Sequence, residues 1–539
     1  MPRAQRYVTL GHPAPAGRAP RVPFFRLPVS DASTPSQTKP APSLARSSAW
    51  NALASVLTVL GRAGATVLVA RGLAPEQTGL LVLGLWIVEM AALVVGLGLP
   101  SGLTRFGAVA AGRGDESELR ALSAWIWRVQ LALLGLGALA LALSLQWGSA
   151  LAVLRPLTPG FCLLLVGQGL GSLLAGRLAA SQAFPRAAGL QATAAGLLVV
   201  AVGLGIQLGG VSGALWGYVI GQLPLAFGAL YVLGRDQAPT PPTAPLKREV
   251  WRFALASWSA GLVSALVWSR LELAFLARSV GSEAVAQFSV ALSMAGFVSQ
   301  LPLLVSGALV SHFASNAAHP DPGRNQQAYA SATRVLASVL FPTCFMASAA
   351  MPVLLPWLFG PAFAPAVPIA AGLAAASALN VSAVGSALIH GAGRAGFITR
   401  TCLLGGGLTI ASGLLLVPWG GTVAAAASRA VVQGLMVGIG CWYIARRLHT
   451  PVPLDSLART AVAAALAAGA IALLMAAAAP PWSLLPGLPV ALGLYLWGLR
   501  QLKALTISDG EALDRWAGRL PAALAGPAQR TVRWLVRWP

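Results

Sequence analysis

Charged residues are scarce in this sequence. Only 10% of its 539 residues are Asp, Glu, Lys or Arg, whereas 56% are hydrophobic; a soluble domain has about 25% charged residues. This shortage excludes an ordinary soluble protein. The five histidines show no metal-ligand spacing, and the four cysteines, Cys162, Cys344, Cys402 and Cys441, all fall within apolar runs. We therefore expect no metal, no other cofactor and no disulfide framework.

Long apolar runs make up most of the sequence. Runs of about 20 residues, the length that crosses about 30 Å of hydrocarbon, recur from residue 48 to about residue 500. They predict an all-α polytopic membrane protein with about fourteen transmembrane helices and no soluble domain between them. The predicted spans are residues 48–70, 79–99, 122–145, 157–177, 188–207, 211–233, 251–277, 284–310, 335–358, 364–389, 396–417, 421–444, 460–479 and 482–499.

Acidic residues are fewer than basic ones, and the positions of the basic residues along the chain follow a pattern. The net charge is +22, and 30 of the 37 Lys and Arg residues fall at the two ends and in alternate connecting segments. The other connecting segments hold three, Arg71, Arg155 and Arg278. This asymmetry follows the positive-inside rule and predicts that both termini lie in the cytoplasm. Topology, with some attraction to anionic lipid, explains the basic excess, so we expect no nucleic-acid partner.

The two halves of the chain resemble each other. VARGLAPEQTGLLVLGL (69–85) aligns with LARSVGSEAVAQFSVAL (276–292) at an offset of 207, and AFPRAAG (183–189) aligns with GAGRAGF (391–397) at 208. Gln222 aligns with Gln433 at 211. Six spans in each half make the repeat parallel, and a cavity is expected between the two lobes.

The repeat, together with the charge pattern, divides the chain into six predicted parts. They are a disordered basic cytoplasmic tail (1–43), an N-terminal six-helix lobe (44–235), a cytoplasmic linker (236–250), a C-terminal six-helix lobe (251–446), a terminal helix pair (447–500) and a cytoplasmic basic amphipathic tail (501–539).

Two arginines lie deep within predicted spans. Arg62 is nine residues before Arg71, which marks the outer end of the first span, so it lies about 13 Å from that end. Arg270 is eight residues before Arg278, or about 12 Å by the same rise. A charge near the midplane costs about 2.5 to 3.5 kcal/mol, and from that depth a snorkelling side chain would reach only part of the way. Both arginines are therefore predicted to line a cavity.

Further polar residues share the helix face of Arg62. Asn51, Ser55, Thr58 and Arg62 are spaced four, three and four residues apart, which places them on one side of the first span. We interpret this stripe as a cavity wall. A polar seam between two packed helices is the alternative.

Two acids and a third arginine belong to the same set. Glu89, in the middle of the second span, is a candidate partner for Arg62 or a proton-binding group. Arg270 and Glu272 are two residues apart, about 200° around a helix, so one should line the cavity and the other should pair with a neighbouring helix. Arg429, within the twelfth span, joins the cationic residues. A cationic cavity suits an anionic, phosphorylated substrate, because arginine matches phosphate oxygens well.

The opening of the first lobe resembles a known family. SLARSSAWNALASVLTVLGRAGATVLVARGLAPEQTGLLVLGL (43–85) is similar to the first two helices of the Wzx-type oligosaccharide flippases and polysaccharide export proteins. These belong to the multidrug, oligosaccharidyl-lipid and polysaccharide exporter superfamily. The marks are an Arg at the end of the first helix and the Leu, Pro-Glu and Gly of RGLAPEQTG. The loop GAGRAGFITR (391–400) also resembles the family, and the likeness covers roughly residues 44–500.

The resemblance implies a flippase of the bacterial inner membrane, not an enzyme, that moves undecaprenyl-diphosphate-linked glycans to the periplasmic leaflet by alternating access. It implies that Arg62, Arg270 and Arg429 hold the diphosphate, while Glu89 or Glu272 couples transport to protons or only balances charge. The expected partners are a lipid-linked oligosaccharide, membrane lipids, and a neighbouring polysaccharide polymerase and glycosyltransferases.

The chain departs from the family at its two ends. The long N-terminal tail is rich in proline and arginine. The C-terminal segment predicts an interfacial helix on the cytoplasmic surface, marked by Trp516, Arg530, Arg533, Trp534, Arg537 and Trp538.

Three other functions stay open at this point. A multidrug antiporter of the same superfamily would share the lobes, but cationic drugs favour an acidic cavity. A lipid II flippase would share both the spans and the cationic cavity. A polysaccharide polymerase or ligase is usually built around a large periplasmic loop, whereas every outer loop predicted here is short.

Overall fold

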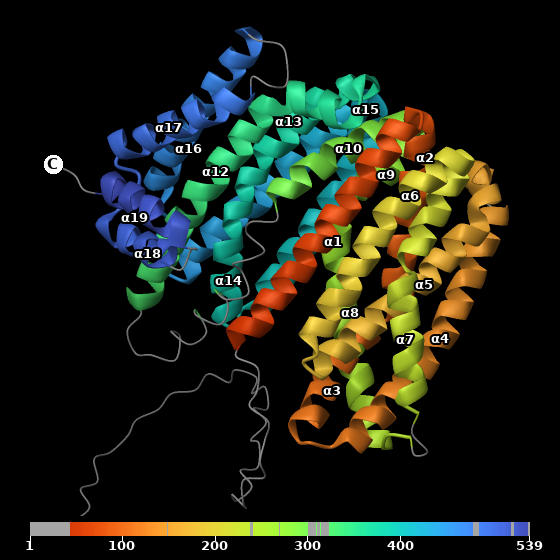
Figure 1. Cartoon of the computed structure of the whole chain (residues 1–539). Coiled ribbons are helices and arrows are strands. Elements are labelled where there is room, and N and C mark those ends of the chain that lie inside the picture. Colours follow the sequence, from red (N-terminus) through yellow and green to blue (C-terminus); the bar gives the residue numbers. More distant parts are fainter. Residues whose placement is uncertain are drawn as a thin grey trace, which may run out of the picture. The chain divides into compact units, whose positions relative to one another are not determined.

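The chain is described by a computed structural model in which every regular element of the described residues is helical (Figure 1). The described residues are 44–147, 149–237, 241–268, 270–299, 309, 313, 323–477, 484–518 and 522–536. Residues 1–43, predicted to be a disordered tail, lie outside them. The prediction of an all-α membrane protein is confirmed.

The first lobe follows the predicted spans, with one helix added. Its elements are α1 (Leu44–Gly72), α2 (Pro75–Gly96), α3 (Leu99–Gly112), α4 (Glu116–Trp147), the 3-10 helix η1 (Ser149–Leu157), α5 (Thr158–Ala180), α6 (Phe184–Gly221) and α7 (Leu223–Arg235). The sequence predicted a connecting segment where α3 lies. Leu97 and Gly98 end α2 in the left-handed region, with φ of 42° and 71°, and α3 begins directly afterwards.

The second lobe is less regular. Its elements are α8 (Ala244–Trp268), α9 (Glu272–Ser279), α10 (Ser282–Val298), α12 (Gly323–Phe359), η2 (Pro361–Ala366), α13 (Val367–Ala376), η3 (Ser377–Ser382), α14 (Ala383–Gly391) and α15 (Ala395–Arg447). The seventh predicted span is broken between α8 and α9. Neither proline nor glycine lies between residues 262 and 280, so no helix-breaking residue marks the break. The tenth span alternates between α and 3-10 helix.

Four helices complete the chain: α16 (Leu454–Ala477), α17 (Leu484–Gln501), α18 (Ile507–Ala517) and α19 (Ala522–Val536). The first two correspond to the predicted terminal pair. The last two pack against each other, α18 also contacts α12, and α19 also contacts α17 (Figure 1). The side chains of Trp516, Arg537 and Trp538 lie outside the described part.

Eight helical stretches in the described residues are long and apolar enough to cross a membrane. Two of them, 184–235 and 396–447, are 52 residues long. The first turns back on itself, because Gly217 lies against Val202 and Gly221 against Leu198. A stretch of this kind supplies two spans, as the sequence predicted.

The two long stretches turn in the same way. Gly210 has φ 55° and ψ −128°, and Gly421 has φ 55° and ψ −138°. A side chain would be strained at this positive φ, which is why glycine occupies both turns. The two residues are 211 positions apart, the offset at which Gln222 aligns with Gln433. The backbone thus repeats the geometry that the sequence repeat predicts.

The lobes meet where α2 and α10 begin. A Cβ on Gly79 of α2 would lie 1.7 Å from the carbonyl oxygen of Ser282, so only glycine permits this approach. At the C-terminal end of α1, Arg71 donates a 2.9 Å hydrogen bond to the carbonyl of Leu358 and another to the carbonyl of Trp357, near the end of α12. These contacts join the halves close to Arg71.

Each half contains an arginine and a serine that together hold a buried aspartate. In the first, Asp236 directly follows α7 and accepts hydrogen bonds from Arg177 at 2.6 and 3.1 Å and from Ser123 at 2.7 Å. Asp236 is 3% exposed. It lies in the segment predicted to be a linker, and nothing in the sequence analysis assigned it a role.

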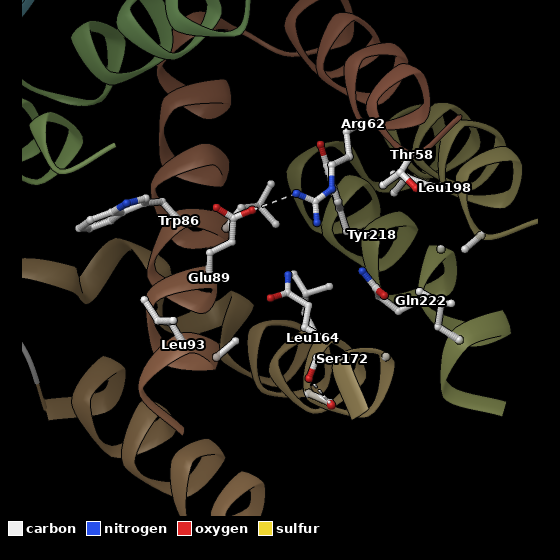
Figure 2. A pocket seen from close by; sticks show the side chains of 18 of the residues that line it. Thr58, Arg62, Trp86, Glu89, Leu93, Leu164, Ser172, Leu198, Tyr218 and Gln222 are labelled. Carbon is white, nitrogen blue, oxygen red and sulfur yellow. Dashed lines mark hydrogen bonds and ion pairs between the residues drawn. The ribbon is translucent and has the colours of Figure 1, made fainter. Parts of the chain in front are cut away.

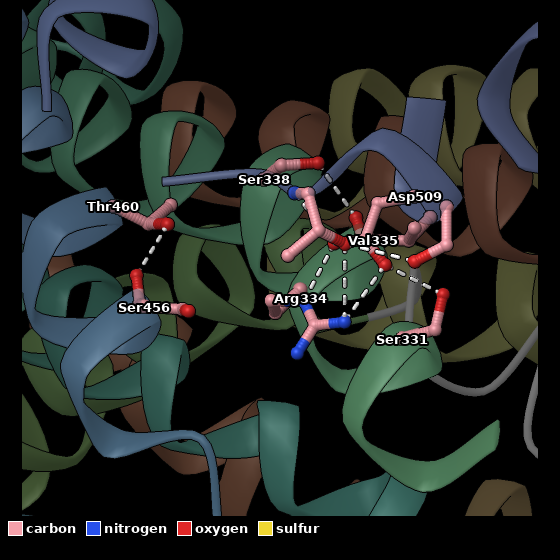
Figure 3. Close-up of polar contacts among 9 residues, drawn as sticks. Ser331, Arg334, Val335, Ser338, Ser456, Thr460 and Asp509 are labelled. Atoms are coloured by element: carbon pink, nitrogen blue, oxygen red, sulfur yellow. Dashed lines mark hydrogen bonds and ion pairs between the residues drawn. The ribbon is translucent and has the colours of Figure 1, made fainter. Parts of the chain in front are cut away.

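In the second, Asp509 of α18 accepts hydrogen bonds from Arg334 at 2.6 and 3.1 Å and from Ser331 at 2.7 Å (Figure 3). Ser331 is 208 positions after Ser123, an offset within the range of the repeat. The acid, however, comes from the C-terminal segment. The helix α18 therefore supplies the C-terminal lobe with a carboxylate like the one that Asp236 supplies in the N-terminal lobe.

Candidate functional site

A cavity of about 1050 Å³ lies mainly within the N-terminal lobe. Its wall is formed chiefly by α1, α2, α5 and α6, with contributions from α8 and α10. Among the described residues, the charged side chains that line it are Arg62, Arg270 and Glu89. The lining therefore carries two cations and one anion among mainly apolar surface.

Arg62 and Glu89 face each other across the cavity (Figure 2). The Nη1 of Arg62 lies 3.5 Å from Oε1 of Glu89, and the side chains are 61% and 46% exposed. An ion pair this long and this accessible contributes at most about 1 kcal/mol. Arg62 is thus held loosely, and a better anionic partner could replace Glu89.

Arg270 reaches the cavity because its helix is broken. It lies between the end of α8 at Trp268 and the start of α9 at Glu272. Its Nη2 lies 3.4 Å from the hydroxyl of Ser293, and its charge interacts with those of Glu89, Arg429 and Arg62. The two arginines predicted to lie at similar depths therefore belong to one electrostatic group.

Arg429 lies near Arg270 but holds a different partner. It does not line the cavity, and its Nη1 donates a 2.8 Å hydrogen bond to Oε1 of Glu272. The side chains of this pair are 15% and 4% exposed. Arg429 thus joins the other two arginines through its charge and not as a lining residue, and its part in a substrate site stays a prediction. Glu272 is turned away from Arg270, toward α15, and a buried carboxylate there needs a cation.

The neighbours of Arg62 on α1 follow it toward the cavity. Ser55 and Thr58 line the wall, and the Thr58 hydroxyl donates a 3.5 Å hydrogen bond to Oε1 of Gln191 on α6. The stripe is therefore both a cavity wall and, at Thr58, part of a helix contact. The side chain of Asn51 lies outside the described residues.

Sequence reasoning missed several lining residues. Tyr218 interacts electrostatically with Arg62, Arg270 and Glu89. Four glutamines, Gln130, Gln168, Gln191 and Gln222, also line the wall. A glutamine inside an apolar span was the signal that could have found them, because an amide in hydrocarbon is costly without a polar neighbour. Within the described part of the chain, no three His, Cys, Asp or Glu side chains gather into a metal site.

Solved structures with the same fold are membrane transporters. An inward-facing multidrug resistance MATE family transporter of the MOP superfamily is 15% identical, with a TM-score of 0.59 over 73% of this chain and 94% of that one. The lipid II flippase MurJ in an inward closed conformation is 12% identical, with a TM-score of 0.68 over 84% and 98%. At such low identity these likenesses show the fold alone.

Comparison of the sequence with protein families classifies the chain more specifically than these structures do. No curated protein sequence matches it. A model of the family described as polysaccharide biosynthesis protein matches residues 44–315, just over half of the chain, and the resemblance seen in the opening helices is thereby confirmed. The chain belongs to the polysaccharide biosynthesis protein family, and it is a multi-pass membrane protein with the fold of transporters and flippases.

Proposed function

We propose that this protein moves polyprenyl-diphosphate-linked oligosaccharides from the cytoplasmic to the periplasmic leaflet of the bacterial inner membrane. The observation that carries the proposal is the cavity in which Arg62 and Arg270 outnumber the single acid, Glu89. Two guanidinium groups that line one cavity suit a diphosphate, because each can donate two parallel hydrogen bonds to phosphate oxygens. The protein would supply a polar path and perform no catalysis.

Binding exchanges one anion for another at Arg62. The substrate diphosphate takes over Arg62 from Glu89, whose 3.5 Å contact is weak, and it also contacts Arg270. Glu89 is then left without its cation, next to a diphosphate whose negative charge repels it. Glu89 is thus the proposed coupling group. The polyprenyl tail stays in the hydrocarbon throughout.

Glu272 and Arg429 hold the framework in this proposal. Both are nearly buried and already paired, so they are poorly placed to exchange partners with a substrate. Their ion pair fastens the start of α9 to α15 beside the break that carries Arg270. Asn51, Ser55 and Thr58 would form a polar entry on the face of α1.

Alternating access follows from the contacts between the lobes. If both termini lie in the cytoplasm, Arg71 and the start of α2 lie at the periplasmic side. The contacts of Gly79 with Ser282 and of Arg71 with the end of α12 then close that side. They must separate for the substrate to leave, and the two lobes would rock about the fixed cationic site.

The proposed divisions of the chain follow from the same topology. Both termini, the linker 236–250 and the tail 501–539 would be cytoplasmic, and the two six-helix lobes and the pair 447–500 would be embedded. A polysaccharide polymerase and glycosyltransferases would act on either side of the transport step.

A lipid II flippase is the second candidate. The likeness to MurJ has a TM-score of 0.68, and lipid II is also a polyprenyl-diphosphate glycan, so the two arginines would serve equally well. A multidrug antiporter fits less well, because a cationic drug would meet two arginines and one acid.

Transport by the purified full-length chain in proteoliposomes tests the proposal. The probes are a fluorescent polyprenyl-diphosphate oligosaccharide, fluorescent lipid II and a cationic dye. We expect translocation of the oligosaccharide lipid. Movement of lipid II alone would favour the second candidate, and movement of the dye alone would refute a diphosphate site.

A further inference from the structure

The polar lining of the cavity exceeds what a diphosphate requires. Gln130, Gln168, Gln191 and Gln222 come from α4, α5, α6 and the residue after α6; we call them the glutamine wall. A diphosphate accepts hydrogen bonds, and arginine already donates them. A glutamine amide offers an acceptor as well as two donors. The wall therefore suits ligand groups that donate and accept.

Most of the hydrogen-bonding capacity of the glutamine wall is unused. Gln130 is 1% exposed; its Nε2 donates to the carbonyl of Val95 at 3.2 Å, while its Oε1 has no partner. The side chains of Gln168 and Gln222 make no hydrogen bond with any described residue. The unpartnered Oε1 of Gln130 is itself buried, but Gln168 and Gln222 are only partly buried and line the cavity. Their amides are therefore open to a partner from outside the chain.

The internal repeat provides a control for this reading. Gln433, the counterpart of Gln222, donates to Oδ1 of Asn380 at 2.9 Å, and Asn380 donates to Ser299 at 3.1 Å. Gln433 lines a pocket of only about 150 Å³ in the C-terminal lobe. The same residue type at the same repeat position is satisfied within the protein in one lobe and free in the cavity of the other.

The packing of α5 makes room for Gln222. A Cβ on Gly167 would lie 3.1 Å from Cβ of Gln222, and one on Gly171 would lie 4.0 Å from its Oε1. The glutamine side chain therefore lies along the part of α5 where Gly167 and Gly171 carry no side chain. Gln222 and Gly171 line the same cavity as Arg62 and Arg270.

We propose that the glutamine wall binds the neutral sugar units that adjoin the diphosphate. The inference rests on the proposed function, since the arginines must first hold the diphosphate. Sugar hydroxyl and acetamido groups both donate and accept, and a neutral ligand needs no counter-charge from the wall. The cavity of about 1050 Å³ is just above the range of about 300–1,000 Å³ for small-molecule sites. It therefore takes the first sugars and not a polymer.

Calorimetric binding to the purified full-length protein tests the wall. The two probes are farnesyl diphosphate and the same lipid diphosphate carrying N-acetylglucosamine. In the Gln168→Leu, Gln222→Leu double variant we expect the affinity for the glycosylated probe to fall about tenfold, the loss expected from two hydrogen bonds. Affinity for farnesyl diphosphate should stay within about twofold of wild type. Leucine preserves the side-chain volume while removing the amide.

Two controls separate the possible results. Gln433→Leu should leave the ratio of the affinities for the two probes unchanged. If the double variant does not fold, the single variants Gln168→Leu and Gln222→Leu are measured in its place. An equal fall for both probes, or no fall for the glycosylated one, overturns the inference. The proposed function fails in a different way: Arg62→Ala would then leave the binding of farnesyl diphosphate unchanged in an otherwise wild-type chain.

Discussion

Asp509 holds the C-terminal helices against α12, and replacing it with alanine should release them. Its carboxylate is fully buried and accepts two hydrogen bonds from Arg334 and one from Ser331 (Figure 3). The backbone N–H and the hydroxyl of Thr506 also donate to it, at 2.9 and 2.6 Å. Alanine removes the acceptor from all of these donors and leaves Arg334, only 14% exposed, without its anion.

The magnitude follows from that burial. Removing one partner of a buried ion pair costs about 3 to 5 kcal/mol, because the remaining charge stays desolvated. Since about 1.4 kcal/mol is a factor of ten, the undocked fraction of residues 507–536 should rise by roughly two to three and a half orders of magnitude. The helices α12, α16 and α17 also pack against one another and should stay folded.

Amide hydrogen exchange over residues 507–536 measures this directly. We expect a large loss of protection in Asp509→Ala and unchanged protection in α16. Arg533→Ala is the matched control, because Arg533 lies 3.5 Å from Asp514 and is 56% exposed, so its loss costs at most about 1 kcal/mol. Equal exchange in Asp509→Ala and wild type would refute the reasoning, as would equal effects of the two substitutions.

The same cluster predicts a dependence on pH. Burial works to raise the pKa of Asp509, but hydrogen bonds from Arg334, Ser331 and Thr506 outweigh it, and the pKa lies below its usual value. A carboxylate with a lowered folded pKa stabilises docking at neutral pH, and this stability is lost as the pH falls below about 4. Protection corrected for intrinsic exchange should therefore be constant from about pH 7 to 5. A loss within that window would contradict the assignment.

Three further predictions concern the membrane part. Arg429→Leu should lower the yield of folded protein, because it leaves the buried Glu272 without its cation at a cost of about 3 to 5 kcal/mol. The double variant with Glu272→Leu should recover the yield. If size-exclusion chromatography shows no recovery in the double variant, the pair is not structural. Glu89→Gln should preserve substrate binding but abolish acceleration of transport by a proton gradient, and unchanged acceleration in proteoliposomes would exclude Glu89 as the coupling group. In a cysteine-free background, a cysteine at Gly209 should react with an impermeant maleimide from the periplasm and one at Gly393 should not; the reverse labelling would overturn the topology.

The sequence predicted those features that depend on local periodicity. A polar stripe at helical spacing placed Ser55 and Thr58 with Arg62 on one face, and the structure sets all three on the cavity wall. Their role in substrate binding remains a proposal. The offset of 211 at which Gln222 aligns with Gln433 also separates Gly210 from Gly421, and the structure shows that these two glycines adopt the same turn.

Features that depend on distant contacts could not be predicted in this way. The break before Glu272 contains no proline or glycine, and Arg429 finds Glu272 from 157 positions away. An arginine in an apolar span has the same pattern whether it faces a cavity or a buried acid. The docking of Asp509 beside Arg334 could not be predicted either, because Asp509 lies in a segment whose sequence predicts an amphipathic tail.

Transport by charge variants of Arg62 and Arg270 tests the central claim most directly. Flipping of a fluorescent polyprenyl-diphosphate oligosaccharide is measured in proteoliposomes that contain equal amounts of wild type, Arg62→Ala, Arg270→Ala and Arg128→Ala. Arg128 is an exposed arginine of α4 that does not line the cavity, so its variant should transport normally. We predict that Arg62→Ala and Arg270→Ala lose transport and that lysine at either position restores only part of it, because lysine keeps the charge but loses the two-pronged contact. Normal transport by both alanine variants would contradict a cationic cavity that holds the diphosphate.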